Sequence, residues 1–217
     1  MSISENLHHI ESEIPAHVRL VAVSKTKPNE QILEAYAYGQ RDFGENYIQE
    51  LTAKAEALPK DIRWHAIGHI QTNKVKYIAP FVHLIHGVDS LKLLQEINKQ
   101  AAKSNRVIDC LLQVFIASEE SKFGLDENEV KEILSDEIIR TLPNIRIVGL
   151  MGIASNTDDE DQVRKEFRNL KSLFDSVKQL HPGITILSMG MSGDYKMAIE
   201  EGSTMIRVGS LIFGERN

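Results

Sequence analysis

The feature that most constrains the fold is a regular alternation of short apolar segments with segments of helical period. Eight strand-like runs occupy residues 18–24, 42–45, 63–67, 82–88, 109–116, 145–153, 184–188 and 204–208. Parallel neighbouring strands need a long crossover connection, which is usually a helix. A chain that alternates in this way is therefore predicted to form a parallel sheet.

The intervening segments carry the period and the end signals of amphipathic helices. Helices are predicted over residues 29–39, 89–104, 126–138, 159–180 and 194–202, and residues 1–17 are predicted to hold an N-terminal helix. Several of these segments open with acidic residues or a capping Asp or Ser, which favour a helix N-terminus. Two of them end at glycine, which favours a helix C-terminus.

Length favours a closed barrel over an open sheet. Dividing 217 residues among eight strand and helix units leaves about 27 residues for each, which is enough for a (β/α)₈ TIM barrel. The alternative is an open doubly wound sheet. However, no GxGxxG follows the first strand and no reversal of strand order is evident. The prediction is an α/β fold with a single barrel domain spanning residues 1–217.

Charge and composition exclude several classes of partner. The net charge is −6 without a cluster of Lys or Arg, so a nucleic-acid partner is disfavoured. The N-terminus lacks the pattern of a secretory signal, and no apolar run reaches the ~18 residues of a membrane span. The chain is therefore predicted to be cytoplasmic. The single Cys110 lies in an apolar run and is predicted to be a small core residue.

The loops after the last two strands are predicted to bind phosphate. A TIM barrel places its active site at the carboxyl ends of the strands, and often binds phosphate after strands seven and eight. The first of these loops carries Gly190, Ser192 and Gly193, with a helix opening behind them. The second carries Gly209 and Ser210. Small residues let the backbone approach a ligand closely, so together the loops form a candidate phosphate cup.

Two cations lie where an apolar barrel would not favour them. Lys25 follows the run Leu-Val-Ala-Val of the first strand, either as a strand end reaching water or as a reactive amine. Arg207 alternates with Ile206 and Val208 in the last strand. If the apolar pair faces the outer helices, Arg207 points into the barrel and needs a carboxylate or a ligand atom as acceptor.

With these residues in view, the chain resembles the pyridoxal phosphate homeostasis protein family, whose fold is similar to the barrel domain of alanine racemase. The stretches that carry the resemblance are VAVSKTKP, DFGENYIQE, RWHAIGHIQTNK, GVDS, LLQV, ESKFG, GLMGI, LSMGMSGDYKMAI and GSTMIRVGSLIFG, spread over nearly the whole chain. The resemblance implies that pyridoxal 5′-phosphate (PLP) is the cofactor and that Lys25 holds it as an internal aldimine.

The same resemblance assigns six further residues to the cofactor. Ser192, Gly193, Gly209 and Ser210 would hold the phosphate, Arg207 would lie against the pyridine nitrogen, and Asn46 would line the cofactor. The chain departs from the family pattern at two positions. Ser210 stands where threonine is common, and either hydroxyl can donate to phosphate. Phe115 stands where a polar residue is expected, which puts a polar contact from the fifth strand in doubt.

Other candidate residues receive simpler interpretations. Lys27 shares a face with Lys25 but directly precedes Pro28, which favours an extended position nearer solvent. The pairs His65 with His69 and His83 with His86 suggest a metal, but a strand and Gly68 argue against the helical face that HxxxH ligation needs. No metal is predicted.

The resemblance implies a carrier or regulator of intracellular PLP (vitamin B6) with no catalytic residue, and apo PLP-dependent enzymes as recipients. Two features favour holding over turnover. The sequence ends three residues after Gly214, without the additional domain of related racemases. Arg207 cannot accept a proton from the pyridine nitrogen, so the ring would be a poorer electron sink. The alternatives are a small PLP-dependent amino-acid racemase and, less favoured, a Schiff-base aldolase acting on a sugar phosphate. A monomer is predicted.

Overall fold

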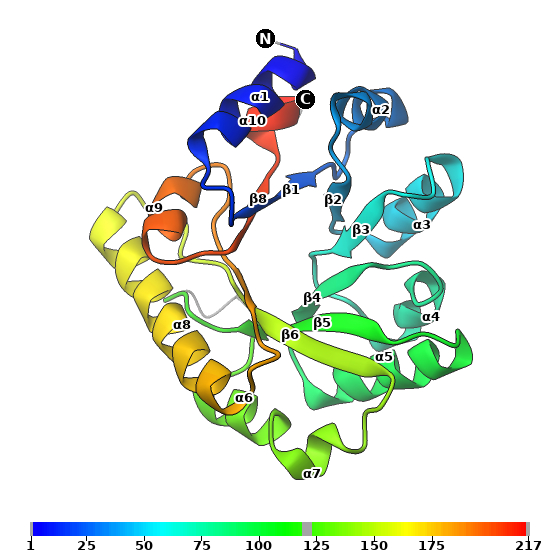
Figure 1. The fold of residues 1–217 in the computed structure, drawn as a ribbon, viewed down its shortest axis with the longest axis vertical. Helices are drawn as coiled ribbons and strands as arrows, with labels where there is room; N and C mark the ends of the chain where they lie inside the picture. The colour runs from blue at the N-terminus through cyan, green and yellow to red at the C-terminus, as the bar shows by residue number, and fades with distance from the viewer. Residues whose placement is uncertain (1, 119–122, 216–217) are drawn as a thin grey trace.

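Eight parallel strands close into a barrel in which each strand pairs with its neighbours in chain order (Figure 1). The computed structural model describes residues 2–118 and 123–215. The strands are β1 (Arg19–Val23), β2 (Asp42–Glu45), β3 (Arg63–Ala66), β4 (Leu84–Val88), β5 (Ile108–Val114), β6 (Ile145–Gly152), β7 (Ile186–Ser188) and β8 (Met205–Val208). Because β1 pairs with both β2 and β8, the predicted closed barrel is confirmed and the open sheet is wrong.

Helices surround the strands and lie on the outside of the barrel (Figure 1). They are α1 (Ile3–Glu13), α2 (Asn29–Tyr38), α3 (Ile48–Ala57), α4 (Val75–Ile78), α5 (Leu91–Lys103), α6 (Glu127–Ile133), α7 (Asp136–Ile139), α8 (Glu160–Leu180), α9 (Tyr195–Glu200) and α10 (Ser210–Phe213), with the 3₁₀ turn η1 (Thr72–Lys74) before α4. Side-chain caps hold the N-termini of α1, α5, α6 and α8, where Ser or Asp accepts from a backbone N–H of the first turn.

All eight predicted strands are present, and their ends differ from the predicted ones by at most two residues. The helix predicted over residues 126–138 is wrong as one element. It divides into α6 and α7, because Leu134 closes α6 and a new turn starts at Asp136. The sequence analysis did not single out α3, although its apolar positions Ile48 and Leu51 are buried.

Two separate apolar clusters explain why the strands hold this shape. The larger one joins the outward side chains of the strands to the helices and includes Ile206 and Val208. The smaller one collects Val21, Leu84, Leu111, Met151 and Met205 from five strands. Val21 pairs in register with Arg207, so Arg207 shares the inward side of the barrel wall, as its alternation with Ile206 and Val208 predicts.

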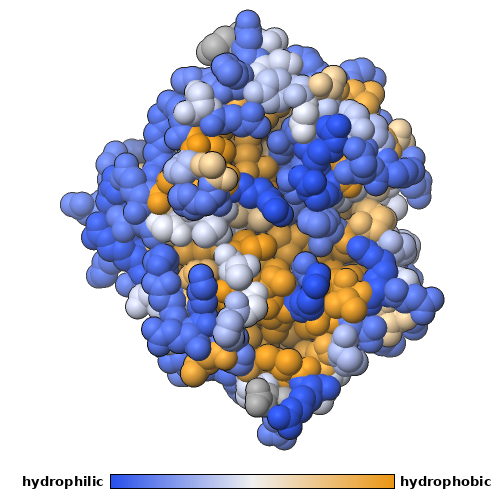
Figure 2. Space-filling model, in the orientation of Figure 1, coloured by the Kyte–Doolittle hydropathy of each residue, from blue (hydrophilic) through white to orange (hydrophobic). Residues whose placement is uncertain are grey.

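Hydrophilic and hydrophobic side chains occupy different parts of the molecule. Hydrophilic side chains cover the helical rim, and hydrophobic ones gather over the strands in the middle and lower part of the view (Figure 2). Cys110 is fully buried in β5, as predicted, and burial raises the pKa of its thiol. Among the described residues, no helix combines the length and apolar character needed to cross a membrane.

Candidate functional site

One cavity of about 430 Å³ opens at the carboxyl ends of β1 and β8. Its lining contains all seven residues that the sequence analysis assigned to the cofactor: Lys25, Asn46, Ser192, Gly193, Arg207, Gly209 and Ser210. These residues come from four stretches of the chain that only the closed barrel brings together. The cavity therefore joins an amine, two hydroxyls and a guanidinium in one concave space.

The chain around Lys25 is held by a buried ion-pair network. The ammonium of Lys54, on α3, donates to the backbone oxygen of Ser24 at 2.8 Å and to Glu45 Oε1 at 2.8 Å. It also donates to Glu50 Oε1 at 2.6 Å, and the same oxygen accepts from the backbone N–H of Thr26 at 2.6 Å. The residues before and after Lys25 are thus both tied to this network.

The network also accommodates an unusual backbone conformation. Thr26 has φ of 65°, a left-handed conformation that a β-branched residue rarely adopts. Its bond to Glu50 holds this turn, which carries the chain away from β1 directly after Lys25. Burial raises the pKa of Glu45, although Lys54 and Ser24 both donate to its carboxylate. Its second oxygen, Oε2, is buried without a hydrogen-bond partner among the described residues.

Lys27 also borders the cavity, but its amine has a structural partner set. Its Nζ donates to the backbone oxygens of Phe213, Gly214 and Glu215 at 3.1, 3.0 and 3.0 Å. These carbonyls lie at and after the end of α10. A lysine in these contacts stabilises the C-terminal segment of the barrel, and the choice of Lys25 over Lys27 as the reactive amine stays a prediction.

The two loops predicted to bind phosphate touch one another across the cavity. The backbone N–H of Gly209 donates to Ser192 Oγ at 3.2 Å. A Cβ at position 209 would lie 3.1 Å from the backbone oxygen of Val23, so the close approach of this loop to β1 favours glycine. Gly190 has φ of 99°, and a Cβ there would meet the Cβ of Ala198 at 2.6 Å. The loops are therefore closely packed wherever they do not face the cavity.

Arg207 reaches the cavity from inside the barrel wall and is only 4% exposed. Its Nη1 donates to Ser188 Oγ at 2.6 Å and its Nη2 donates to the backbone oxygen of Gly152 at 3.0 Å. Burial lowers the pKa of Arg207 to about 10, so the guanidinium still carries its charge at neutral pH. Both acceptors are neutral, which leaves the cation able to receive an acceptor atom from a ligand.

Of the paired histidines, His65 and His86 are fully buried and do not line this cavity, whereas His69 is exposed. His65 lies on β3, as the strand prediction requires, and His69 pairs with Asp89 at 2.8 Å. Ligand atoms of Asp42, His65 and His83 lie within 4.8 Å of one another, a spacing that a cation could use. Arg63, however, donates to both carboxylate oxygens of Asp42, at 2.8 and 2.6 Å. A cation would compete with this guanidinium, and the expectation of no metal stays a prediction.

Comparisons with known proteins agree with this geometry. The model of the alanine racemase N-terminal domain family matches residues 1–217. The pyridoxal phosphate homeostasis protein of Vibrio alginolyticus is 44% identical over 231 residues, which cover 100% of this chain and 98% of the relative. The chain belongs to the pyridoxal phosphate homeostasis protein family. Its human member is 42% identical over 219 residues, covering 94% of this chain and 79% of that protein.

Solved structures place the family in the same fold. PipY of Synechococcus elongatus PCC7942, with PLP bound, superposes with a TM-score of 0.89 at 36% identity, covering 98% of this chain and 100% of PipY. An alanine racemase of Clostridium difficile 630 has a TM-score of 0.79 at 18% identity, covering 99% of this chain and 56% of the racemase. The second likeness shows the shared barrel alone.

Some family positions stay open and others were missed. Phe115 follows β5 and is 40% exposed, and the loss of a polar contact there stays a prediction. Of the stretch 120–124, residues 120–122 lie outside the described residues. The sequence analysis missed Lys54 and Ser188. Lys54 follows Glu50 by four residues on one helix face, a spacing that indicates a pair but not its burial.

Proposed function

We propose that the protein binds PLP covalently through Lys25 and takes part in PLP homeostasis as a carrier or regulator. The observation that carries this proposal is the single cavity that collects the lysine, both small-residue loops and the buried arginine. Family members named for PLP homeostasis and the PLP-bound PipY support it. The cavity volume of about 430 Å³ lies within the range of small-molecule sites.

The residues that the sequence analysis assigned to the cavity have separate roles toward this cofactor. When bound, PLP supplies an aldehyde that condenses with an amine, releases one water, and is released again when another amine replaces the first. Lys25 supplies the amine. Ser192 and Ser210 offer hydroxyls to the phosphate, and Gly193 and Gly209 keep the loops free of side chains that would fill the space. Asn46 lines the same cavity from the end of β2.

The charge of Arg207 favours holding over turnover. A guanidinium donates hydrogen bonds and cannot accept a proton, so a pyridine nitrogen beside it stays largely unprotonated. An unprotonated ring withdraws electrons weakly, which disfavours racemisation and decarboxylation. A small amino-acid racemase is the second candidate, because the alanine racemase family shares this barrel. The aldolase is a weaker third, since it would use Lys25 and the loops without a cofactor.

A spectroscopic titration followed by a chiral assay tests the proposal. PLP added to the purified protein should produce a visible absorption band that saturates at one cofactor per chain and disappears on adding a competing amine. When the PLP-loaded protein is incubated with L-alanine in large molar excess over the cofactor, the alanine should remain in the L form. Absence of the band would favour the aldolase assignment. Rapid formation of D-alanine would favour the racemase assignment over the carrier.

A glycine substitution tests the placement of Asn46. A Cβ at position 68 would lie 2.5 Å from the backbone oxygen of Asn46, so Gly68→Ala must move the Asn46 backbone. We expect PLP affinity to fall by about tenfold, because bound geometry of a cofactor site tolerates displacements well below 1 Å. Gly183→Ala is the matched control, since nothing lies within 4 Å of a Cβ there. Equal PLP affinities of the two variants would contradict the placement of Asn46 in the cofactor site.

The physiological context consists of predictions from the sequence and the family. We propose a cytoplasmic, monomeric protein whose recipients are apo PLP-dependent enzymes, with neither nucleic acid nor a membrane as partner. Gel filtration coupled to light scattering checks the monomer. Transfer of cofactor absorbance to an apo aminotransferase, measured against free PLP at equal concentration, checks the recipients.

A further inference from the structure

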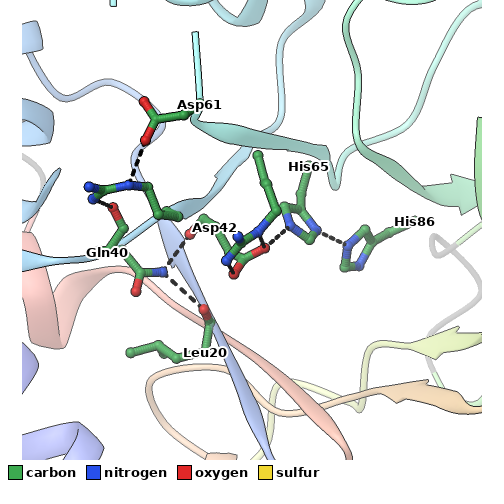
Figure 3. Close-up of polar contacts among 8 residues, drawn as sticks. Leu20, Gln40, Asp42, Asp61, His65 and His86 are labelled. Carbon is green, nitrogen blue, oxygen red and sulfur yellow. Dashed lines mark hydrogen bonds and ion pairs between the residues drawn. The ribbon is translucent and has the colours of Figure 1, made fainter. Parts of the chain in front are cut away.

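A continuous chain of hydrogen bonds crosses the barrel interior from the cavity to the opposite end. Arg207 donates to Ser188 Oγ at 2.6 Å, and Ser188 Oγ lies 3.1 Å from His86 Nδ1. His86 Nε2 lies 2.9 Å from His65 Nδ1, and His65 Nε2 lies 2.9 Å from Asp42 Oδ1. Figure 3 shows the distal part of this chain, from His86 through His65 to Asp42.

The two ends of the chain lie at opposite ends of the barrel. Asp42 is the first residue of β2, whereas Arg207 lies near the carboxyl end of β8. Ser188, His86 and His65 are fully buried between them. Arg63 closes the distal end by pairing with Asp42, and its own side chain is 44% exposed. The chain thus connects a solvent-facing ion pair with the cavity.

The chemistry of the two end groups fixes the direction of every bond. A guanidinium cannot accept, so Ser188 Oγ must accept from Arg207 and can direct its own hydrogen to His86 Nδ1. An ionised carboxylate cannot donate, so His65 Nε2 must carry the hydrogen that meets Asp42. His65 Nδ1 is then an acceptor, and it receives the hydrogen of His86 Nε2. Arg207 as an obligatory donor and Asp42 as an obligatory acceptor therefore require the same donor-to-acceptor direction along the chain.

The surroundings keep this arrangement neutral in the middle. Burial lowers the pKa of His65 and lowers that of His86 well below its usual value. The charged or titratable groups acting on these rings are Asp42, His83 and the cations Arg19, Arg63 and Arg207. Burial acts to raise the pKa of Asp42, but hydrogen bonds from Arg63 and His65 hold it well below its usual range. Each neutral imidazole donates through one nitrogen and accepts through the other, which agrees with hydrogen bonds that all run from the cation Arg207 toward the anion Asp42.

We propose that Ser188, His86, His65 and Asp42 form a relay that positions Arg207 for the cofactor from the far end of the barrel. The inference rests on the proposed function, because Arg207 acts on PLP only if PLP binds. Among the described residues, Ser188 is the side chain that joins Arg207 to the histidines, so removing it separates the arginine from the relay. Within the described part of the chain, His65 hydrogen-bonds to His86 and Asp42 and does not line the cavity, yet it fixes which nitrogen of His86 carries the hydrogen.

A double-mutant cycle on PLP affinity tests the relay. Ser188→Ala should weaken PLP binding by about tenfold, since it removes an acceptor from a charged donor. His65→Leu, which removes both ring nitrogens, should weaken it by about threefold. The double variant should be about as weak as Ser188→Ala alone, because both changes break one chain. Effects that multiply, to about thirtyfold, would overturn the relay.

Two matched variants separate the relay from general damage to the core. Ser188→Thr keeps the hydroxyl and should restore most of the affinity. Ser203→Ala removes another buried hydroxyl, which contacts the backbone oxygens of Leu187, Met189 and Met205 and lies outside the relay. Its PLP affinity should stay near that of the unchanged protein once both are folded. An equal loss in Ser203→Ala and Ser188→Ala would contradict the positioning role.

Nitrogen NMR of the imidazoles gives a readout that needs no cofactor. At neutral pH, His65 and His86 should each carry hydrogen on Nε2 only, and Ser188→Ala should shift the ring signals of His86 while Ser203→Ala leaves them in place. Hydrogen on Nδ1 of either ring would overturn the relay. If the unchanged protein shows no PLP band, the proposed function fails, and these spectra still decide whether the relay exists. They also decide it if His65→Leu does not fold.

Discussion

Lys25→Ala protein is expected to show no visible band of covalently bound PLP at any cofactor concentration. We propose the amine at position 25 as the group that forms the bond, because Lys25 lines the cavity together with both serine loops and Arg207. The serine loops and Arg207 remain, so the phosphate and ring should still bind without the bond. We expect the apparent affinity to fall on the order of tenfold or more, measured by equilibrium dialysis.

Lys27→Ala is the matched control for this experiment. It removes a lysine that borders the same cavity, and it should retain the band at full intensity. Its expected effect is on stability, because the carbonyls after α10 lose their donor. A band that persists in Lys25→Ala and vanishes in Lys27→Ala would reverse the assignment of the two lysines.

Lys54→Met is expected to lower the free energy of unfolding by about 3 kcal/mol at pH 8, because it leaves the buried carboxylate of Glu45 without its cation. Methionine has a side chain of similar length to lysine, so the loss of unfolding free energy reflects the missing charge more than a change in volume. The backbone oxygen of Ser24 loses its donor, and Glu50, which accepts from Thr26, loses its bond to the ammonium, so covalent attachment at Lys25 should weaken. Urea unfolding with and without PLP measures both effects.

The pH dependence of this variant follows from Glu45. Burial raises the pKa of Glu45, and removal of Lys54 raises it further. A carboxyl whose pKa is raised by folding costs stability as pH rises through its unfolded value and upward, whereas a protonated carboxyl costs little. The difference from the unchanged protein should therefore be smaller at pH 5 than at pH 8. A difference that grows toward pH 5 would contradict this account.

A surface lysine supplies the control for Lys54. Lys131 on α6 pairs with Glu127, and both side chains are exposed. Lys131→Met should change the free energy of unfolding by less than about 0.5 kcal/mol, with little dependence on pH. A comparable loss of unfolding free energy in both variants would show that the buried Lys54–Glu45 ion pair contributes no more to stability than an exposed pair.

The sequence predicted the barrel because the alternation of strands and helices is a local pattern with few topological solutions. The resemblance to a family then assigned seven residues, which the fold brings to one cavity. Ends of elements were less accurate. The helix predicted over residues 126–138 divides because Leu134 closes α6 and a new turn starts at Asp136, a break that local propensity alone does not show.

The polar interior could not be predicted in this way. His65 and His86 are separated by 21 residues, and Ser188 lies 102 residues beyond His86, so no local spacing indicates their contacts. The alternation that places Arg207 inside the barrel did predict that it needs an acceptor. It could not predict that the acceptor is a neutral serine at the end of a chain of histidines. Closure of the barrel, which brings side chains of the non-adjacent strands β4 and β7 together in its interior, supplies that information.

The most direct test of the account is to locate the covalent attachment in the unchanged protein. Protein saturated with PLP is reduced with borohydride, digested and analysed by mass spectrometry, with the competing amine added beforehand as a control. The account predicts one phosphopyridoxyl group per chain, on the peptide that contains Lys25, and none after amine treatment. Modification of a different lysine, or no modification at a saturating cofactor concentration, would contradict it.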